Sequence, residues 1–285
     1  RLPISIKHKK NQWQVVSSTG GLASAMAGVH KEIPFTWVGW PGTSFFPSEE
    51  EEISNLLNQR DLSAVFISRE QEEHYYHTIC NSFLWPLFHY FTDRAALSSE
   101  SWPYYEKVNE LYAEVVLKNA AQGATIWVHD FHLMLLPKLL RGKRPDLQIG
   151  FFLHIPFPSS EIYRMLPKRE MLLEGVLGAD YIGFHTSDYA RHFCESCMRV
   201  LGLDRREKNI VYEGREIGVG VHPIGMNIKA FKEVLEKPQY FSYIQKIKSQ
   251  YSSLKVILGV ERLDYTKGIS IKLQAFEAFL EKNKE

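Results

Sequence analysis

The sequence is short of cysteine, of long apolar runs and of net charge. Its 285 residues include three cysteines, too few for a disulfide framework, so a reducing, cytoplasmic setting is expected. No apolar run approaches the roughly 20 residues that span a bilayer, so no membrane partner is expected. The formal net charge of +1 gives no basic field for a nucleic acid. No Asp-x-Asp occurs, so there is no sign of a metal-clamped diphosphate site.

The residues that are present suit a globular protein with a polar cleft. Apolar residues make up 45% and charged residues 24%, as in an ordinary globular domain. Aromatic residues reach 13%, and there are 11 histidines. Aromatic rings with polar neighbours are what a sugar-binding or nucleotide-binding cleft uses.

Apolar, β-branched runs alternate with helical patterns along the chain. This alternation predicts an α/β fold with a doubly wound, Rossmann-like parallel sheet. The expected strands are 35–40, 64–68, 125–129, 149–154, 181–185, the hairpin 210–212 with 217–221, and 256–260. The expected helices run from 68 to about 85, 101–119, around 133–140, from 187 to about 202, 238–251 and 270–282.

A domain boundary is expected between His222 and Pro238. We divide the chain into an N-terminal Rossmann-like acceptor-binding domain, 1–235, and the beginning of a nucleotide-sugar-binding domain, 236–285. After the helix 238–251, the second part offers one strand, one loop and one helix, which cannot bury a core of their own. We therefore expect a longer protein, with a strand before Arg1 and the rest of the second domain after Glu285.

A pair of glycines precedes a helix of small residues near the start of the chain. Gly20 and Gly21 follow the hydroxyl-bearing residues 17–19. Glycine lets a ligand approach the backbone closely, and a helix N-terminus presents free N–H groups. The segment predicts a diphosphate contact, with a plain loop as the alternative.

A charged loop follows the expected strand 256–260. Arg262 can form two hydrogen bonds to phosphate oxygens, Lys267 adds a point charge, and Gly268 keeps the entrance to the next helix open. In doubly wound sheets, ligands bind at the carboxyl ends of strands. The loop predicts a phosphate site, with a solvated charged loop as the alternative.

Two further strands end on polar residues. The segment 127–132 carries Asp130, whose carboxylate can accept hydrogen bonds from sugar hydroxyls. Its alternative is a helix N-cap. His154 ends the strand 149–154, before two prolines that would hold the imidazole in place, and its alternative is a structural role.

Three large rings complete the candidate site. Trp40 ends a strand, and Tyr76 and Trp85 share a predicted helix. Such rings stack on sugar faces, and their polar atoms bind hydroxyls or phosphate. Core packing is the alternative for each ring taken alone.

Taken together and in order, these segments resemble trehalose-6-phosphate synthases, glycosyltransferase family 20, over essentially the whole chain. The segments that carry the resemblance are Arg1-Leu2-Pro3, 18–22, Gly39-Trp40-Pro41-Gly42, 75–86, 127–132, 154–158, 183–186 and 261–268.

The resemblance implies the GT-B architecture, in which two Rossmann-like domains face each other across a cleft. It implies transfer of glucose from UDP-glucose to glucose 6-phosphate with retention of configuration, without a metal cofactor. It places Arg1, Trp40, Tyr76, Trp85 and Asp130 around the acceptor, and Gly20, Gly21, His154, Arg262 and Lys267 around the donor. The implied catalytic set is Asp130, His154, Arg262 and Lys267.

Three alternatives stay open at this point. One is a sister transferase that uses another phosphorylated acceptor, such as glycerol 3-phosphate. Another is a regulatory subunit that binds sugar phosphate without catalysis. The third is a metal-dependent hydrolase, with ligands drawn from His129, Asp130, His132, His154 and His185. Assembly into a homo-oligomer is left open.

Overall fold

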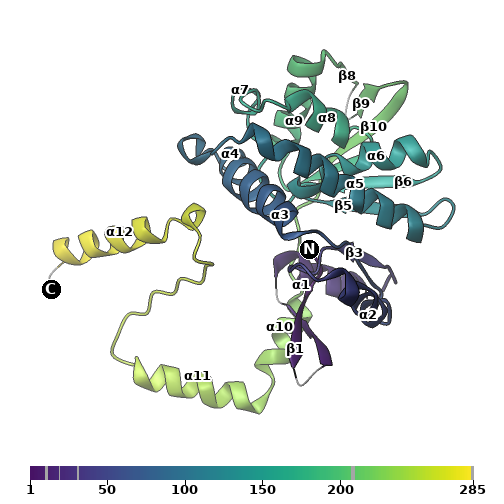
Figure 1. The fold of residues 1–285 in the computed structure, drawn as a ribbon. Helices are drawn as coiled ribbons and strands as arrows, with labels where there is room; N and C mark the ends of the chain where they lie inside the picture. Colours follow the sequence, from purple (N-terminus) through teal and green to yellow (C-terminus); the bar gives the residue numbers. More distant parts are fainter. Residues whose placement is uncertain (10–11, 19, 31, 207–208, 284–285) are drawn as a thin grey trace. The chain divides into compact units, whose positions relative to one another are not determined.

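The computed structural model describes residues 1–285 except 10, 11, 19, 31, 207, 208, 284 and 285. It divides into two units, Arg1–Met226 and Asn227–Glu285 (Figure 1). The domain limits 1–235 and 236–285 stay a prediction.

The largest sheet of the described residues has six strands in the order β5-β6-β7-β10-β9-β8. The first four are parallel, β9 runs antiparallel to β10, and β8 runs antiparallel to β9. The bounds are β5 Thr125–His129, β6 Gln148–Phe152, β7 Tyr181–Phe184, β10 Arg215–Val221, β9 Asn209–Tyr212 and β8 Arg205–Arg206. The predicted α/β class with a largely parallel sheet is confirmed.

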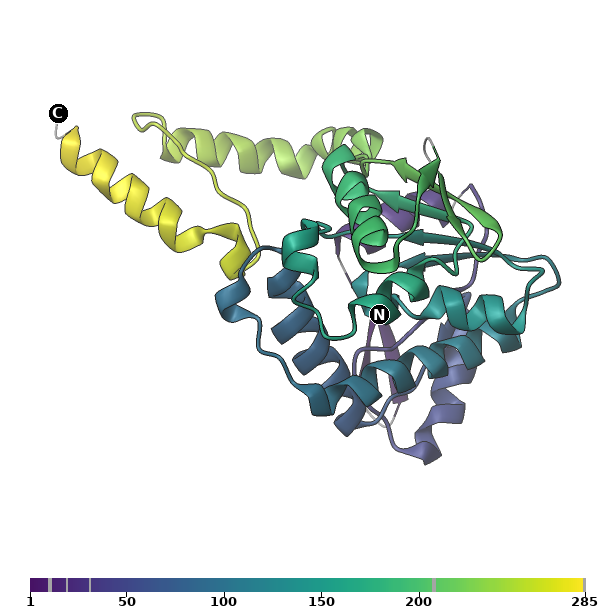
Figure 2. The same cartoon turned by 90° about the horizontal axis from the view of Figure 1, so that it is seen from above.

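One face of this sheet is covered by helices. Helix α6 (Leu136–Lys143) contacts β6, and α9 (Ser187–Leu201) contacts β7 and β10 (Figures 1 and 2). Helix α8 (Arg169–Val176) packs against both helices. Alternate strand residues point into this layer and are buried: Val128, Ile149, Phe151, Ile182, Phe184, Ile217 and Val219. The apolar side chains on this face therefore hold the parallel strands against the layer of helices.

The first 64 residues form two small sheets and two helices. Strands β3 (Trp37–Gly39) and β4 (Leu62–Ala64) pair in parallel. The predicted strand 64–68 is therefore wrong in its bounds, since the observed strand is Leu62–Ala64 and its pairing with β3 ends at Ala64. Strands β1 (Ile4–Lys9) and β2 (Gln12–Ser17) form an antiparallel hairpin that was not predicted from the sequence. The helices are α1 (Gly21–His30) and α2 (Pro47–Asn58).

The helix predicted for 68–85 is present but unusual. It begins at α3 (Arg69–Gln71), continues as a π-helix η1 (Glu72–Leu84) and ends as α4 (Trp85–Phe88). The Ser68 hydroxyl accepts a 3.1 Å hydrogen bond from the Gln71 amide, as an N-cap does. Pro86 lies where η1 passes into α4, and it has no N–H to donate. The Ser82 carbonyl, four residues earlier, accepts instead from the N–H of Ala96 at 2.9 Å.

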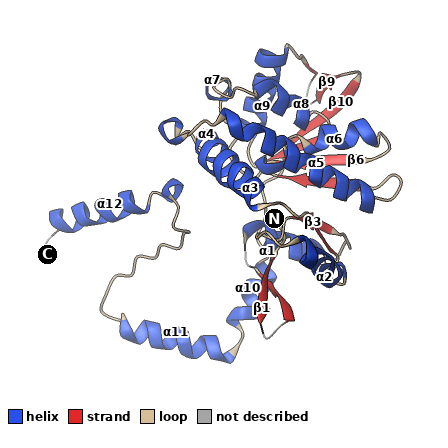
Figure 3. Ribbon diagram, in the orientation of Figure 1, coloured by secondary structure: helices blue, strands red, loops and turns tan. Residues whose placement is uncertain are grey.

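The remaining helical segments of the first unit connect these layers (Figure 3). They are η2 Thr92–Arg94, η3 Ser99–Ser101, α5 Trp102–Asn119, η4 Phe131–Leu133 and α7 Ser160–Tyr163.

The second unit consists of α10 (Ile228–Leu235), α11 (Pro238–Gln250), η5 (Tyr265–Lys267) and α12 (Ile269–Lys282). The predicted strand 256–260 is wrong, because this segment has no pairing partner in the described part of the unit. Within the described ranges, the search for a helix long and apolar enough to cross a bilayer finds none.

Candidate active site

Four histidines mark one edge of the main sheet. His129 is the last residue of β5, and His154, His185 and His222 follow β6, β7 and β10 within two residues. The carboxyl ends of parallel strands meet at the same edge, where doubly wound folds bind ligands. The structure therefore brings His154 and Asp130, which follows His129, to this strand-end edge.

Asp130 and His154 are joined through the backbone. Oδ1 of Asp130 accepts a 3.2 Å hydrogen bond from the backbone N–H of His154. The Asp130 N–H donates to the carbonyl of Phe152 at 2.7 Å, which continues the pairing of β5 with β6. Asp130 has a φ of +72°, a region that non-glycine residues rarely occupy. This backbone conformation turns the chain sharply from β5 into η4.

The imidazoles of His129 and His154 are hydrogen-bonded to each other, with 3.0 Å between Nδ1 of His129 and Nε2 of His154. Burial lowers the pKa of His129 to about 4. Burial and the neighbouring His129 and His185 lower the pKa of His154 to about 3. Burial raises the pKa of Asp130 to about 6. At pH 7 both rings are neutral and the carboxyl group is mostly ionised.

Three of the predicted acceptor residues form a ring cluster, which we define as Trp40, Tyr76, Trp85, Phe131 and His132. The Trp40 and Tyr76 ring centroids lie 5.2 Å apart, and Tyr76 stacks on His132 at 5.8 Å. Trp85 lies 6.0 Å from Phe131, which itself lies 4.0 Å from His132. The rings therefore converge on the turn that begins with Asp130.

Arg1 lies at one end of the ring cluster. Its guanidinium carbon is 5.8 Å from the Trp40 ring centroid, within cation–π range. The N–H of Leu2 donates to the Trp40 carbonyl at 2.8 Å. A Cβ at Gly39 would lie 3.0 Å from the Leu2 nitrogen, and one at Gly42 would meet the Arg1 guanidinium. These two glycines leave room for the first residues beside Trp40.

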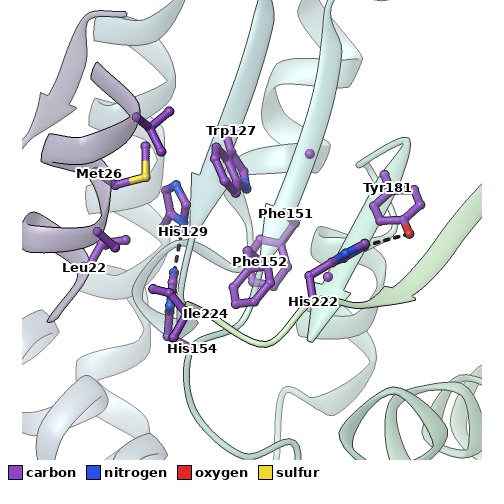
Figure 4. A pocket seen from close by; sticks show the side chains of 14 residues that line it. Leu22, Met26, Trp127, His129, Phe151, Phe152, His154, Tyr181, His222 and Ile224 are labelled. Carbon is purple, nitrogen blue, oxygen red and sulfur yellow. Dashed lines mark hydrogen bonds between the residues drawn. The ribbon is translucent and has the colours of Figure 1, made fainter. Parts of the chain in front are cut away.

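A cavity of about 470 Å³ lies between α1 and the uncovered face of the main sheet. In Figure 4, the bonded pair His129–His154 lies between Leu22 and Met26 of α1 on one side and Phe152 on the other. The other lining residues are Ala25, Val29, Trp127, Gly150, Phe151, Tyr181, Gly183, His222 and Ile224. We call the sheet face that carries Trp127, His129, Phe152 and Tyr181 the open face.

The glycine pair lies at the start of α1. Gly20 and Gly21 are exposed, and the Gly20 carbonyl accepts from the N–H of Ser24 at 2.8 Å. Thr19 of the same motif is outside the described residues. The backbone of this turn is therefore accessible beside the cavity that Leu22 helps to line.

The charged loop 261–268, which we call the phosphate loop after its expected ligand, belongs to the second unit. Arg262 and Lys267 are exposed, and Arg262 forms a 3.3 Å ion pair with Asp264. The Asp264 carboxylate accepts from the N–H of Thr266 at 2.9 Å, and Gly268 has a φ of +62°. The loop is a capped turn with two exposed cations.

Sequence reasoning gave His129 and His132 a place only as metal ligands in the hydrolase alternative. In the described part of the chain, no three His, Cys, Asp or Glu side chains gather in a way that could hold a metal ion. His129 instead bonds His154, and His132 stacks on Tyr76. For His129 the available signal was its position at the end of β5, because residues there face the neighbouring strand ends.

The family follows from comparison with known proteins. Residues 1–285 match the model of glycosyltransferase family 20. The chain belongs to this family. An α,α-trehalose-phosphate synthase [UDP-forming] of Schizosaccharomyces pombe is 44% identical over 292 residues, which cover 100% of this chain and 57% of the relative. The chain thus spans little more than half the length of that relative.

Solved structures share the fold as well. The Candida albicans trehalose-6-phosphate phosphatase N-terminal domain has a TM-score of 0.83 at 33% identity, covering 93% of this chain and 58% of that one. The E. coli trehalose-6-phosphate structure bound with UDP-2-fluoro glucose has a TM-score of 0.81 at 31% identity, covering 94% and 60%. A Burkholderia xenovorans synthase in complex with glucose-6-phosphate has a TM-score of 0.80 at 28% sequence identity. The match covers 93% of this chain and 59% of that one. The predicted GT-B architecture is confirmed.

Proposed function

We propose that the protein to which this chain belongs transfers glucose from UDP-glucose to glucose 6-phosphate and forms α,α-trehalose 6-phosphate and UDP. The observation that carries the proposal is the strand-end edge, where Asp130 and His154 meet beside the ring cluster. Relatives bound to a UDP-glucose analogue and to glucose-6-phosphate support the same pair of substrates.

The acceptor site is assigned to Arg1, Trp40, Tyr76, Trp85 and Asp130. The Arg1 guanidinium lies over the Trp40 indole ring, and the N–H groups at its edge are suited to bind a phosphate. The aromatic rings can stack on a sugar face. An ionised Asp130 accepts hydrogen bonds from sugar hydroxyls, and its pKa of about 6 leaves it charged at neutral pH.

The donor site is assigned to Gly20, Gly21, His154, Arg262 and Lys267. Cleavage of the bond from the glucose C1 to the diphosphate oxygen builds negative charge on the diphosphate. Exposed cations at Arg262 and Lys267, together with backbone N–H groups near Gly21, are groups of the type that stabilise this charge. A new bond forms from C1 to the acceptor hydroxyl oxygen, and the hydroxyl proton goes to the leaving phosphate on the same face. No metal is invoked in these steps.

The cytoplasm is the proposed location. The sequence has three cysteines, Cys80, Cys194 and Cys197, and all three are buried. So few cysteines do not make a disulfide framework, which fits a reducing compartment.

A regulatory subunit without activity is the second candidate, because the matching Candida albicans domain carries the name of a phosphatase. This candidate predicts binding of glucose 6-phosphate without turnover.

An acceptor screen on the full-length protein tests the proposal. UDP release from UDP-glucose is measured with glucose 6-phosphate, with glycerol 3-phosphate and with no acceptor, each with and without a chelator. We expect release with glucose 6-phosphate only, unaffected by chelation, and an α,α-linked product by NMR. Calorimetric binding of both ligands without UDP release would favour the regulatory subunit. Complete loss on chelation, restored by metal, would refute the metal-free site.

A further inference from the structure

His154 is held at two points by the two residues that end the neighbouring strand. The carboxylate of Asp130 accepts a hydrogen bond from its backbone N–H, and the imidazole of His129 bonds its Nε2. Its ring also lies 4.7 Å from Phe152 and 5.6 Å from His185, measured between centroids. Four side chains therefore limit the movement of this imidazole.

The bond between the two imidazoles also couples their proton positions. A neutral imidazole carries one proton, so one of its nitrogens donates and the other accepts. In the 3.0 Å contact, one of the two facing nitrogens must donate and the other must accept. If Nε2 of His154 donates, its Nδ1 is an acceptor, and if Nε2 accepts, its Nδ1 is a donor. The state of Nδ1 is thus coupled to the tautomer of His129 on the opposite side of the ring.

Nδ1 is the nitrogen of His154 that a ligand can use. Among the described residues, no hydrogen bond reaches this atom, whereas Nε2 is already bonded to His129. His129 and His154 both line the 470 Å³ cavity beside the start of α1. A bound sugar hydroxyl would therefore meet a nitrogen whose donor or acceptor character is coupled to the ring of His129.

We propose that His129 is a positioning residue that fixes the orientation and the tautomer of His154. The inference about the ring pair stands on geometry, and its consequence for catalysis rests on the proposed function. The relation resembles that of metal-bound histidines, whose second ring nitrogen is fixed by a neighbouring partner. Here the partner is a second histidine on the adjacent strand, and the ligand is the donor sugar.

Nuclear magnetic resonance on the full-length protein labelled with ¹⁵N-histidine tests the inference without substrate. We expect a resolved ¹⁵N–¹⁵N coupling between Nδ1 of His129 and Nε2 of His154, because only a hydrogen bond transmits it. We also expect the His154 nitrogen shifts of one neutral tautomer. Absence of the coupling together with shifts averaged between two tautomers would overturn the inference, even if no variant folds.

Two substitutions at His129 then separate positioning from packing. His129→Leu keeps volume but removes the bond, while His129→Asn retains an amide near the place of Nδ1. We expect averaged His154 shifts in His129→Leu and a single tautomer in His129→Asn. His192→Leu is the matched control, because this histidine bonds the Phe157 carbonyl from α9 and does not line the cavity. An unchanged His154 spectrum in His129→Leu would contradict the inference.

Kinetics provide the readout that depends on the proposed function. With UDP-glucose varied, His129→Leu should lower kcat/KM roughly five- to tenfold, as expected for one lost hydrogen bond, and His129→Asn should recover most of it. The KM for glucose 6-phosphate should not change. A wild-type protein that shows the coupling but releases no UDP would refute the proposed function and leave the positioning role standing.

Discussion

The ring cluster and the phosphate loop differ most in how their residues are held. Trp40 is 3% exposed and touches Tyr76, while its backbone N–H donates to the phenol oxygen of Tyr112 at 2.9 Å. The Arg262 side chain is 73% exposed and pairs with Asp264, two residues away. A buried ring stabilises the fold and also shapes the proposed binding site. An exposed cation contributes little to the stability of the fold. Substitutions in the two regions should therefore separate folding from catalysis.

The largest effect on stability is expected for Trp40→Ala. Removing a buried indole takes away apolar contacts and leaves a cavity, which costs about 3–5 kcal/mol of unfolding free energy. Urea unfolding followed by circular dichroism measures this change. Trp127→Ala is the matched control, since Trp127 lies on the open face and is 52% exposed. Equal losses for the two tryptophans would contradict the picture of Trp40 as a core residue of the cluster.

The next largest effect is expected on turnover, for Arg262→Ala. Loss of one group that stabilises the leaving diphosphate raises the barrier by about 3–4 kcal/mol, which lowers kcat on the order of a hundredfold or more. The melting temperature should stay within a degree or two of wild type, because the side chain is exposed. Steady-state kinetics and calorimetry on the full-length protein measure the two quantities.

Arg199→Ala provides the control for that comparison. Arg199 is also an exposed arginine, paired with Glu161 at 3.0 Å on the surface of the first unit. Its removal should change neither kcat nor melting. If Arg262→Ala kept full kcat with an intact fold, the role of the phosphate loop would be refuted.

The sequence predicted much of the sheet, because apolar β-branched runs specify buried parallel strands. β5 was predicted at its observed bounds, and Asp130 and His154 were expected at carboxyl ends of strands, where they lie. The roles of these residues stay predictions. The segment 256–260 shows the limit of prediction from a local pattern. Its apolar residues are typical of a strand, but a strand forms only when a neighbouring strand pairs with it.

Long-range contacts between side chains were beyond sequence reasoning. The π-helical turn geometry of η1 places Tyr76 against His132, yet no local signal distinguishes it from an α-helix. The bond from His129 to His154 depends on the register that pairs His129 with Phe152. Such registers follow from packing of the whole sheet rather than from local residues.

The smallest of the expected effects is a loss of stability in mild acid, and it involves the ring cluster and the histidines that line the cavity. His132 belongs to the ring cluster and has a pKa of about 3, while His129 and His154 face the cavity with pKa values of about 4 and 3. Burial lowers all three below the ordinary 6.5. The unfolded chain therefore binds protons first, and stability present above pH 6.5 is lost as the pH falls toward 3.

Asp130 acts in the opposite direction. Its pKa is raised from 3.8 to about 6, so the folded state binds its proton first, and this contribution to stability grows as the pH falls through 6. Three histidines outweigh one carboxyl group, and because all four groups keep partial solvent contact, we expect a net loss of about 2 kcal/mol between pH 7.5 and 5. Urea unfolding at each pH measures it. His132→Phe keeps a ring against Tyr76 and removes one titrating group, so it should reduce the loss by about a third. A protein equally stable at both pH values would show that these imidazoles are hydrated rather than buried.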